Sequence, residues 1–171
     1  MKTLLAVILL SLPALAADQA PAAVAAACGP DNVKFDVDSS GRQPAAQPEP
    51  GKALVYVVEQ FDRPTNELGR PTIRVGLDGS WMGANRGTSY LSFSVEPGAH
   101  HLCADWQSLP RWLHVPASLA NLTAEPAQTY YLRARVMENA GYFTLDLEPV
   151  NSDQGRMLIE TSPLSGYRQK K

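Results

Sequence analysis

Imidazole and thiol side chains are scarce in this chain, which limits the chemistry that it can carry out. Its 171 residues include three histidines and two cysteines. Nucleophilic hydrolysis needs a nucleophile, a base that is most often histidine, and an orienting carboxylate, and no nucleophile-elbow motif accompanies any of the histidines. We therefore predict a protein that is not an enzyme and that has no cofactor and no resident metal.

An excess of positive charge is also lacking. The chain has 15 Lys and Arg against 17 Asp and Glu, a formal net charge of −2 at pH 7, and the charges are spread without long runs. Nucleic-acid binding requires clustered basic residues that neutralise phosphates. The sequence therefore predicts no nucleic-acid partner. For the same reason we do not expect the chain to bind an anionic membrane surface.

Long apolar runs are missing, apart from one near the start. A transmembrane helix needs about 18 or more consecutive apolar residues, whereas the run from Leu4 to Leu12 is short and is followed by Pro13. Lys2 precedes this run, and the small-residue signal Ala14-Leu15-Ala16 follows it. The pattern is that of a secretory signal peptide over residues 1–16, cleaved before Ala17. We expect an extracytoplasmic protein, periplasmic or secreted, without a transmembrane segment.

The two cysteines, Cys28 and Cys103, both lie beyond that cleavage site. Disulfides persist in extracytoplasmic compartments, so we predict that they pair with each other. The alternative is that Cys28 is a lipidated N-terminus, because "VAAAC" loosely resembles a lipobox. Ala25 stands where a leucine is usual, and Cys28 is twelve residues past Ala16, too far from the apolar run. The alternative would anchor the protein to a membrane through lipid.

Residues 17–50 are interpreted as an N-terminal arm. Within it, "NVKFDVDSS" alternates apolar and polar residues with the period of two that is typical of a half-buried strand. The proline-rich stretch "GRQPAAQPEPG" then favours an extended linker that ends at Gly51.

Residues 51–150 predict an antiparallel β-sandwich of seven or eight strands, immunoglobulin-like or transthyretin-like. Period-two alternation recurs in segment after segment, separated by turn residues, which favours a sandwich over alternating strands and helices. "KALVYVVEQF" is apolar on both faces, as expected of a central strand that is covered on both sides. Asp78-Gly79 lies between two such segments and predicts a tight hairpin turn.

The remaining residues, 151–171, are interpreted as a C-terminal segment with a basic tail. Asn151 and Gln154 form a plausible capping box, so one short helix is expected there, although Gly155 weakens it. The basic end with Arg168, Lys170 and Lys171 is expected to fray into solvent.

The order "GKALVYVVEQ", "IRVGLDGSWMG", "YLSFSVEPGAHHLCA" and "TYYLRARV" resembles the bacterial family called domain of unknown function 2846, over roughly residues 51–150. The middle third is also similar to PEGA-type surface modules, in which an "xVxLDGxxxG" hairpin precedes a "PGxH" turn. Both resemblances imply a small extracytoplasmic β-sandwich of bacterial origin, and neither implies a catalytic residue.

The histidines offer one alternative function. Alternation places His100 with Leu102 on one face of its strand and His101 with Cys103 and Asp105 on the other, so the two histidines cannot share an ion. A zinc site would have to join His101 and Asp105 to a distant group such as His114. A metal-dependent or hydrolytic extracytoplasmic enzyme using these three residues is therefore the competing hypothesis.

The tryptophans indicate binding instead. Trp81 follows the Asp78-Gly79 turn and Trp112 lies in the proline-bounded loop "LPRWLHVP", whereas Trp106 fits the inward face of its strand. Exposed tryptophans stack on sugar rings or anchor protein partners, although any of the three could equally fill the core. The preferred hypothesis is a non-catalytic module of the cell envelope or secretome that binds an envelope protein or polysaccharide through Trp81 or Trp112.

Overall fold

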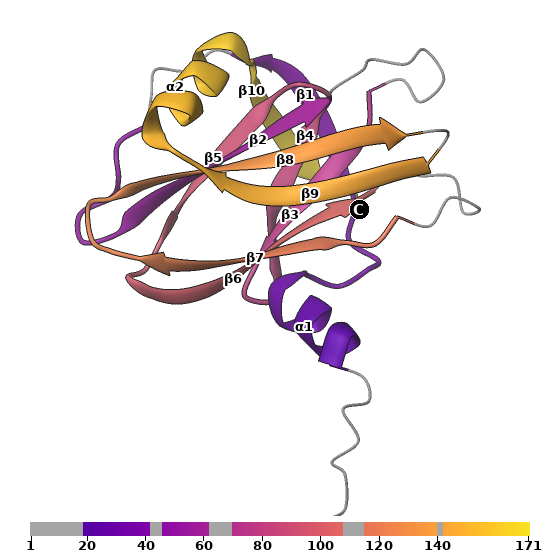
Figure 1. Ribbon diagram of the computed structural model, residues 1–171, viewed down its shortest axis with the longest axis horizontal. Coiled ribbons are helices and arrows are strands. Elements are labelled where there is room, and N and C mark those ends of the chain that lie inside the picture. The colour runs from indigo at the N-terminus through magenta and orange to yellow at the C-terminus, as the bar shows by residue number, and fades with distance from the viewer. Residues whose placement is uncertain (1–18, 42–45, 62–69, 108–114, 140–141) are drawn as a thin grey trace, which may run out of the picture.

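The computed structural model describes residues 19–41, 46–61, 70–107, 115–139 and 142–171. These residues form two helices and ten strands (Figure 1), which are α1 (Gln19–Ala27), β1 (Phe35–Gly41), β2 (Ala53–Phe61), β3 (Thr72–Leu77), β4 (Ser80–Arg86), β5 (Tyr90–Val95), β6 (Gly98–Trp106), β7 (Ser118–Ala124), β8 (Thr129–Asn139), β9 (Tyr142–Val150), α2 (Ser152–Thr161) and β10 (Leu164–Gln169). The predicted signal peptide and its cleavage site lie outside the described residues.

The strands form two packed sheets, which confirms the predicted all-β sandwich. Sheet A has the order β1-β10-β5-β2-β8-β9, and sheet B has the order β4-β3-β6-β7. Most strand pairs are antiparallel, as predicted, but β2 pairs with β8 in parallel and β10 meets β5 in parallel. Between β2 and β8 the chain crosses to sheet B, which supplies the long crossover that a parallel pair requires.

The core lies between the two sheets and is built from every second residue of the strands, those whose side chains point inward. Val55 and Val57 of β2 face Ile73 and Val75 of β3, and all four are fully buried. The opposite phase of β2 is buried too, because Leu158 of α2 and neighbouring side chains cover the outer face of sheet A. This second cover explains why β2 is apolar on both faces.

Two local predictions are confirmed. Asp78 and Gly79 have φ values of 48° and 80°, so the turn between β3 and β4 uses two left-handed residues, as a tight hairpin requires. Asn151 is the N-cap of α2, and its Oδ1 accepts a hydrogen bond of 2.9 Å from the Gln154 N–H.

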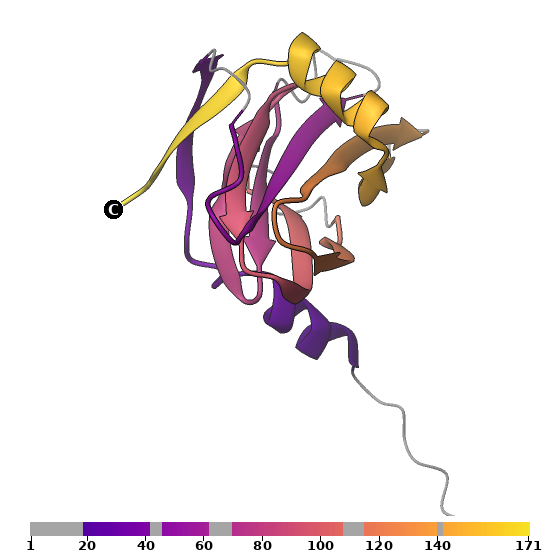
Figure 2. The ribbon, with the colours of Figure 1, turned by 90° about the vertical axis from the view of Figure 1, so that its left-hand side faces the viewer.

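The C-terminal tail does not fray as expected. Residues 164–169 form β10, which pairs with β1 of the N-terminal arm from Gly41 and Leu164 to Phe35 and Gln169. The Lys170 N–H continues the ladder by donating to the Lys34 carbonyl at 2.7 Å. Figure 2 shows β1 and β10 side by side at one edge of the sandwich. The backbone bonds between the arm and the tail therefore hold the basic end in place.

Gly155 marks the contact between α2 and sheet A. It is buried against Tyr131 of β8, and a Cβ at this position would overlap the Tyr131 side chain. We predict that Gly155→Ala lowers the free energy of unfolding by about 1–3 kcal/mol, because overpacking outweighs the gain in helix propensity of about 1 kcal/mol. Urea unfolding measures the change. Met157→Ala is the control, since Met157 is 56% exposed and its loss should cost little. A more stable Gly155→Ala variant would contradict the described packing.

Candidate functional site

A disulfide joins Cys28, directly after α1, to Cys103 of β6, which confirms the predicted pairing. Their Cα atoms are 5.2 Å apart, and the bond links positions separated by 75 residues. With its sulfur in this bond, Cys28 has no thiol for lipid attachment, and Cys103 has no thiolate for a metal. The disulfide fixes the N-terminal arm on the outer face of sheet B.

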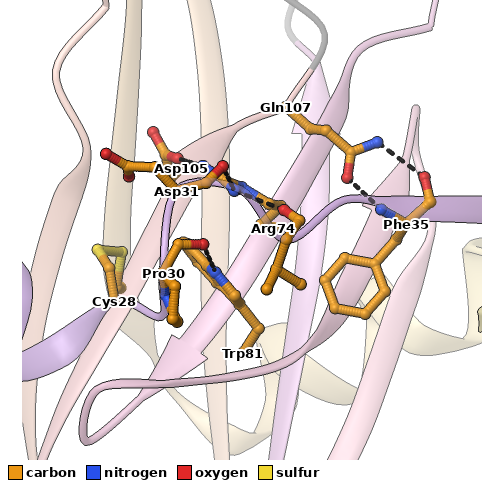
Figure 3. A network of polar contacts seen from close by, with 10 residues as sticks. Cys28, Pro30, Asp31, Phe35, Arg74, Trp81, Asp105 and Gln107 are labelled. Carbon is orange, nitrogen blue, oxygen red and sulfur yellow. Dashed lines mark hydrogen bonds and ion pairs between the residues drawn. A yellow bond between two sulfur atoms is a disulfide. The ribbon is translucent and has the colours of Figure 1, made fainter. Parts of the chain in front are cut away.

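Beyond the disulfide, side chains of sheet B bind the backbone of the arm. The Trp81 Nε1 donates to the Pro30 carbonyl at 2.9 Å, and the Arg74 Nη1 donates to the carbonyls of Asp31 and Val33 at 3.2 and 2.7 Å. Figure 3 shows these donors pointing from the sheet toward the arm. We call residues 28–35 the docked segment.

Register explains how these donors come together. Cys103, Gly76 and Trp81 are cross-strand partners on β6, β3 and β4, and Arg74 lies opposite Asp105 in the next row. Gly76 leaves the middle of its row without a side chain, and a Cβ there would lie 2.7 Å from the Ala27 carbonyl oxygen. Glycine at this position therefore lets the backbone of the arm approach the sheet closely.

The guanidinium of Arg74 is enclosed, since the residue is only 5% exposed. Its Nη2 pairs with the Asp105 carboxylate, and its Cζ lies 4.2 Å from the centroid of the Trp81 ring. A buried charge is costly unless it is paired and its donors are satisfied. Here a carboxylate, two carbonyls and an aromatic face meet that requirement, although the Arg74 Nε has no partner among the described residues.

Gln107 holds the other end of the docked segment. Its amide accepts from the Phe35 N–H at 2.6 Å and donates to the Phe35 carbonyl at 2.7 Å, as a neighbouring strand would. At the N-terminal end of the docked segment, Gly29 packs so closely on Trp81 that a Cβ on this residue would overlap the indole. The segment is thus held by a disulfide and by bonds to its backbone.

A surface hollow of about 380 Å³ opens where the docked segment meets β4 and β10. Its lining includes Phe35, Ser80, Trp81, Met82, Tyr167 and Gln169, together with two apolar residues of the arm. Phe35 and Tyr167 meet edge to face with their ring centroids 5.9 Å apart. Tyr167 also lies over Gly83, where a Cβ would come within 2.5 Å of its ring. We call this feature the aromatic hollow.

The structure brings one of the two predicted binding tryptophans to this hollow. Trp81 is half-buried, with its Nε1 used by the arm and its ring beside the Arg74 guanidinium. Trp112 lies outside the described residues. Trp106 is buried in the core at 7% exposure, as its inward phase predicts.

The residues of the alternative metal site do not converge as far as they are described. His101 and Asp105 are four positions apart on one strand, about 13 Å at ~3.3 Å per residue, whereas zinc ligands lie about 2 Å from the ion. The His101 Nδ1 contacts the Asn121 Oδ1 at 2.9 Å, and Asp105 pairs with Arg74. Among the described residues no three His, Cys, Asp or Glu side chains are placed to bind a metal, and His114 lies outside them.

Glu59 is a buried group that the sequence reasoning missed. It is fully buried, and neither carboxyl oxygen has a hydrogen-bond partner among the described residues. Burial raises the pKa of the Glu59 carboxyl well above 4.5. The Gly87 backbone lowers this pKa, but by less than burial raises it. Its position two residues after Val57 on the inward phase of β2 is a signal that could have identified it. A perturbed carboxyl is a common catalytic feature, but no described histidine or cysteine is hydrogen-bonded to the Glu59 carboxyl.

His100 connects two hairpin turns. Its Nδ1 lies 2.6 Å from the Asp78 Oδ2 and its Nε2 lies 2.7 Å from the Glu96 carbonyl oxygen. Both partners are acceptors, so this geometry favours the doubly protonated ring. Burial alone would lower the pKa of His100, but the bonds to Asp78 and Glu96 raise it above 6.5 overall. For Asp78, burial raises the pKa, and the bonds to His100 and His101 outweigh it, leaving the pKa below 3.8.

Comparisons with known proteins found no matching family model, no similar curated protein and no similar solved structure. Neither α1 nor α2 combines the length and apolar character that a membrane-spanning helix needs; this applies to the described residues alone.

Removing the disulfide tests how the arm is held. We expect the Cys28→Ala/Cys103→Ala variant to lose up to about 4 kcal/mol of unfolding free energy, because a loop of 75 positions is no longer closed in the unfolded chain. Hydrogen exchange should show lost protection in residues 28–35 and retained protection in β2. Trp81→Phe, which keeps the disulfide but removes the bond to Pro30, should cost only about 1 kcal/mol. Two alkylatable thiols in the native parent would contradict the pairing.

The His100–Asp78 pair predicts a window of pH in which it contributes fully. Because the pKa of His100 is raised above 6.5, its contribution is present below pH 6.5 and is lost as the pH rises through the folded value. The lowered pKa of Asp78 means that its contribution is lost as the pH falls through a value below 3.8. An NMR titration of the imidazole should give His100 a pKa above 6.5, which Asp78→Asn lowers. Glu96→Gln, which keeps the carbonyl, should change it less; no response to Asp78→Asn would refute the pairing.

Proposed function

We propose that this chain is a non-catalytic, extracytoplasmic β-sandwich module of the bacterial envelope or secretome, and that it binds an envelope protein or polysaccharide. The observation that carries the proposal is the aromatic hollow, in which Trp81, Phe35 and Tyr167 line an open surface. Its volume of about 380 Å³ lies within the range of about 300–1,000 Å³ usual for ligand pockets.

Rigidity of the hollow supports a role in binding. The arm contributes Phe35 and is fixed by the Cys28–Cys103 disulfide, while Trp81 is held by Pro30 and Arg74. Side chains that are already ordered lose little conformational entropy when a ligand binds. A clamped aromatic surface is therefore better suited to binding than a loose one.

The disulfide and the sequence pattern support the proposed compartment. A Cys28–Cys103 bond is stable where the environment is oxidising, and residues 1–16 have the features of a signal peptide. The resemblance to the domain of unknown function 2846 family and to PEGA-type modules adds a bacterial, extracytoplasmic setting.

The competing hypothesis is an enzyme that uses His101, Asp105 and His114. His101 and Asp105 already have other partners, Asn121 and Arg74. Glu59 is enclosed in the core and lies outside the lining of the aromatic hollow. A binding module accounts for the described residues with fewer assumptions.

Co-sedimentation with isolated bacterial envelope fragments tests the proposal. The parent should bind saturably, and Trp81→Ala and Tyr167→Ala should each weaken binding roughly tenfold, as expected when a central aromatic contact is lost. Tyr142→Ala is the matched control, because Tyr142 is 76% exposed and lies on β9, an edge strand of sheet A that three strands separate from β10. Circular dichroism and intact mass verify the fold and the disulfide of each variant. Absent binding, or equal binding by all four proteins, would reject the proposal.

A further inference from the structure

We infer that the aromatic hollow takes the ring of a neutral sugar, stacked on the aromatic side chains of Trp81 and Tyr167. This inference rests on the proposed function and names the class of ligand for the same site. Its basis is the chemistry of the lining, which combines aromatic surface with uncharged polar groups.

The lining carries no charged side chain. Arg74 is a buried cation that lies beside the Trp81 ring, and it is already paired with Asp105 and the arm carbonyls. An anionic ligand would therefore find no free cation in the hollow, and a cationic ligand would find no carboxylate. A ligand that loses its hydration in this hollow without a cost for unpaired charge must itself be neutral.

Three uncharged polar groups surround the aromatic surface. Ser80 and Tyr167 present hydroxyls and Gln169 presents an amide, and none of these side chains has a hydrogen-bond partner among the described residues. Hydroxyls and amides both donate and accept. They match the rim of a sugar ring, whose hydroxyls also do both, while the C–H faces of the ring match the aromatic floor.

The floor is held in place before any ligand arrives. The Trp81 indole is fixed by its bond to the Pro30 carbonyl and by the Arg74 guanidinium, and Tyr167 is fixed between Phe35 and Gly83. Stacking on a fixed ring costs little side-chain entropy. The space of about 380 Å³ is open at the surface, so one unit of a longer chain could enter while its neighbours remain in solvent.

Calorimetric titration with defined oligosaccharides tests the inference. The probes are the neutral cellotetraose and chitotetraose, the anionic tetragalacturonate, and an uncharged Ser/Gly/Tyr peptide of similar size. We expect at least one neutral tetrasaccharide to bind the parent and neither tetragalacturonate nor the peptide to do so. Binding of the peptide alone, or of no probe, would overturn the inference.

Variants assign the binding to the hollow and separate it from loss of fold. Trp81→Ala and Gln169→Ala should each weaken binding of the neutral sugar, roughly tenfold for the tryptophan. Trp81→Phe keeps an aromatic ring but loses the bond to Pro30, so it should retain more affinity than Trp81→Ala. Tyr142→Ala should bind like the parent. A sugar that binds every variant equally lies elsewhere, and the inference then fails.

Competition distinguishes the failure of this inference from failure of the proposed function. If the neutral tetrasaccharide displaces the protein from envelope fragments, both stand. Envelope binding could instead depend on Trp81 without being displaced by the sugar. If protease treatment of the fragments then abolishes this binding, the partner is a protein. The inference then fails, and the proposed function survives. If neither the fragments nor the sugars bind, both fail.

Discussion

A buried guanidinium on the outer face of sheet B requires the N-terminal arm to lie across it. Arg74 is satisfied by Asp105 on the neighbouring strand and by the Asp31 and Val33 carbonyls of the arm. If the arm left, two of these acceptors would go with it, and the charge would have to recover its hydration. Arg74 therefore binds the arm from the outer face of sheet B, while the disulfide holds the arm covalently. The aromatic hollow exists because both hold the same segment.

Periodicity predicted the sandwich because burial on one face of a strand requires alternation, whatever the partner strands are. The inward positions Ile73, Val75 and Leu102 are fully buried as that pattern requires. The turn at Asp78-Gly79 was equally predictable, since few residues tolerate its backbone angles. The pairing of β1 with β10 was not, because it joins two short segments at opposite ends of the chain, of which only the first, "NVKFDVDSS", alternates clearly.

The contacts of the outward-pointing residues were harder to predict from the sequence than those of the core. In the sequence, Arg74 alternates with apolar residues as an exposed arginine would. It is buried only because the N-terminal arm covers it. Trp81 lines a surface hollow, but its bond to Pro30 and its contact with Gly29 follow from the register across three strands and from the path of the arm. Glu59 is the reverse case. Its inward phase was visible in "VYVVEQF", yet a charged residue at a strand end is more often exposed than buried.

Stability of the arm and ligand binding in the hollow are physically linked. Phe35 is part of the docked segment, and Trp81 both holds that segment and lines the hollow. A ligand that binds only when the segment is docked must stabilise the docked state by the corresponding free energy, and docking must favour the ligand equally. The disulfide keeps the docked state dominant without ligand, so little of the binding free energy is spent on ordering the arm. An oxidising compartment, which maintains that bond, therefore also maintains the geometry of the hollow.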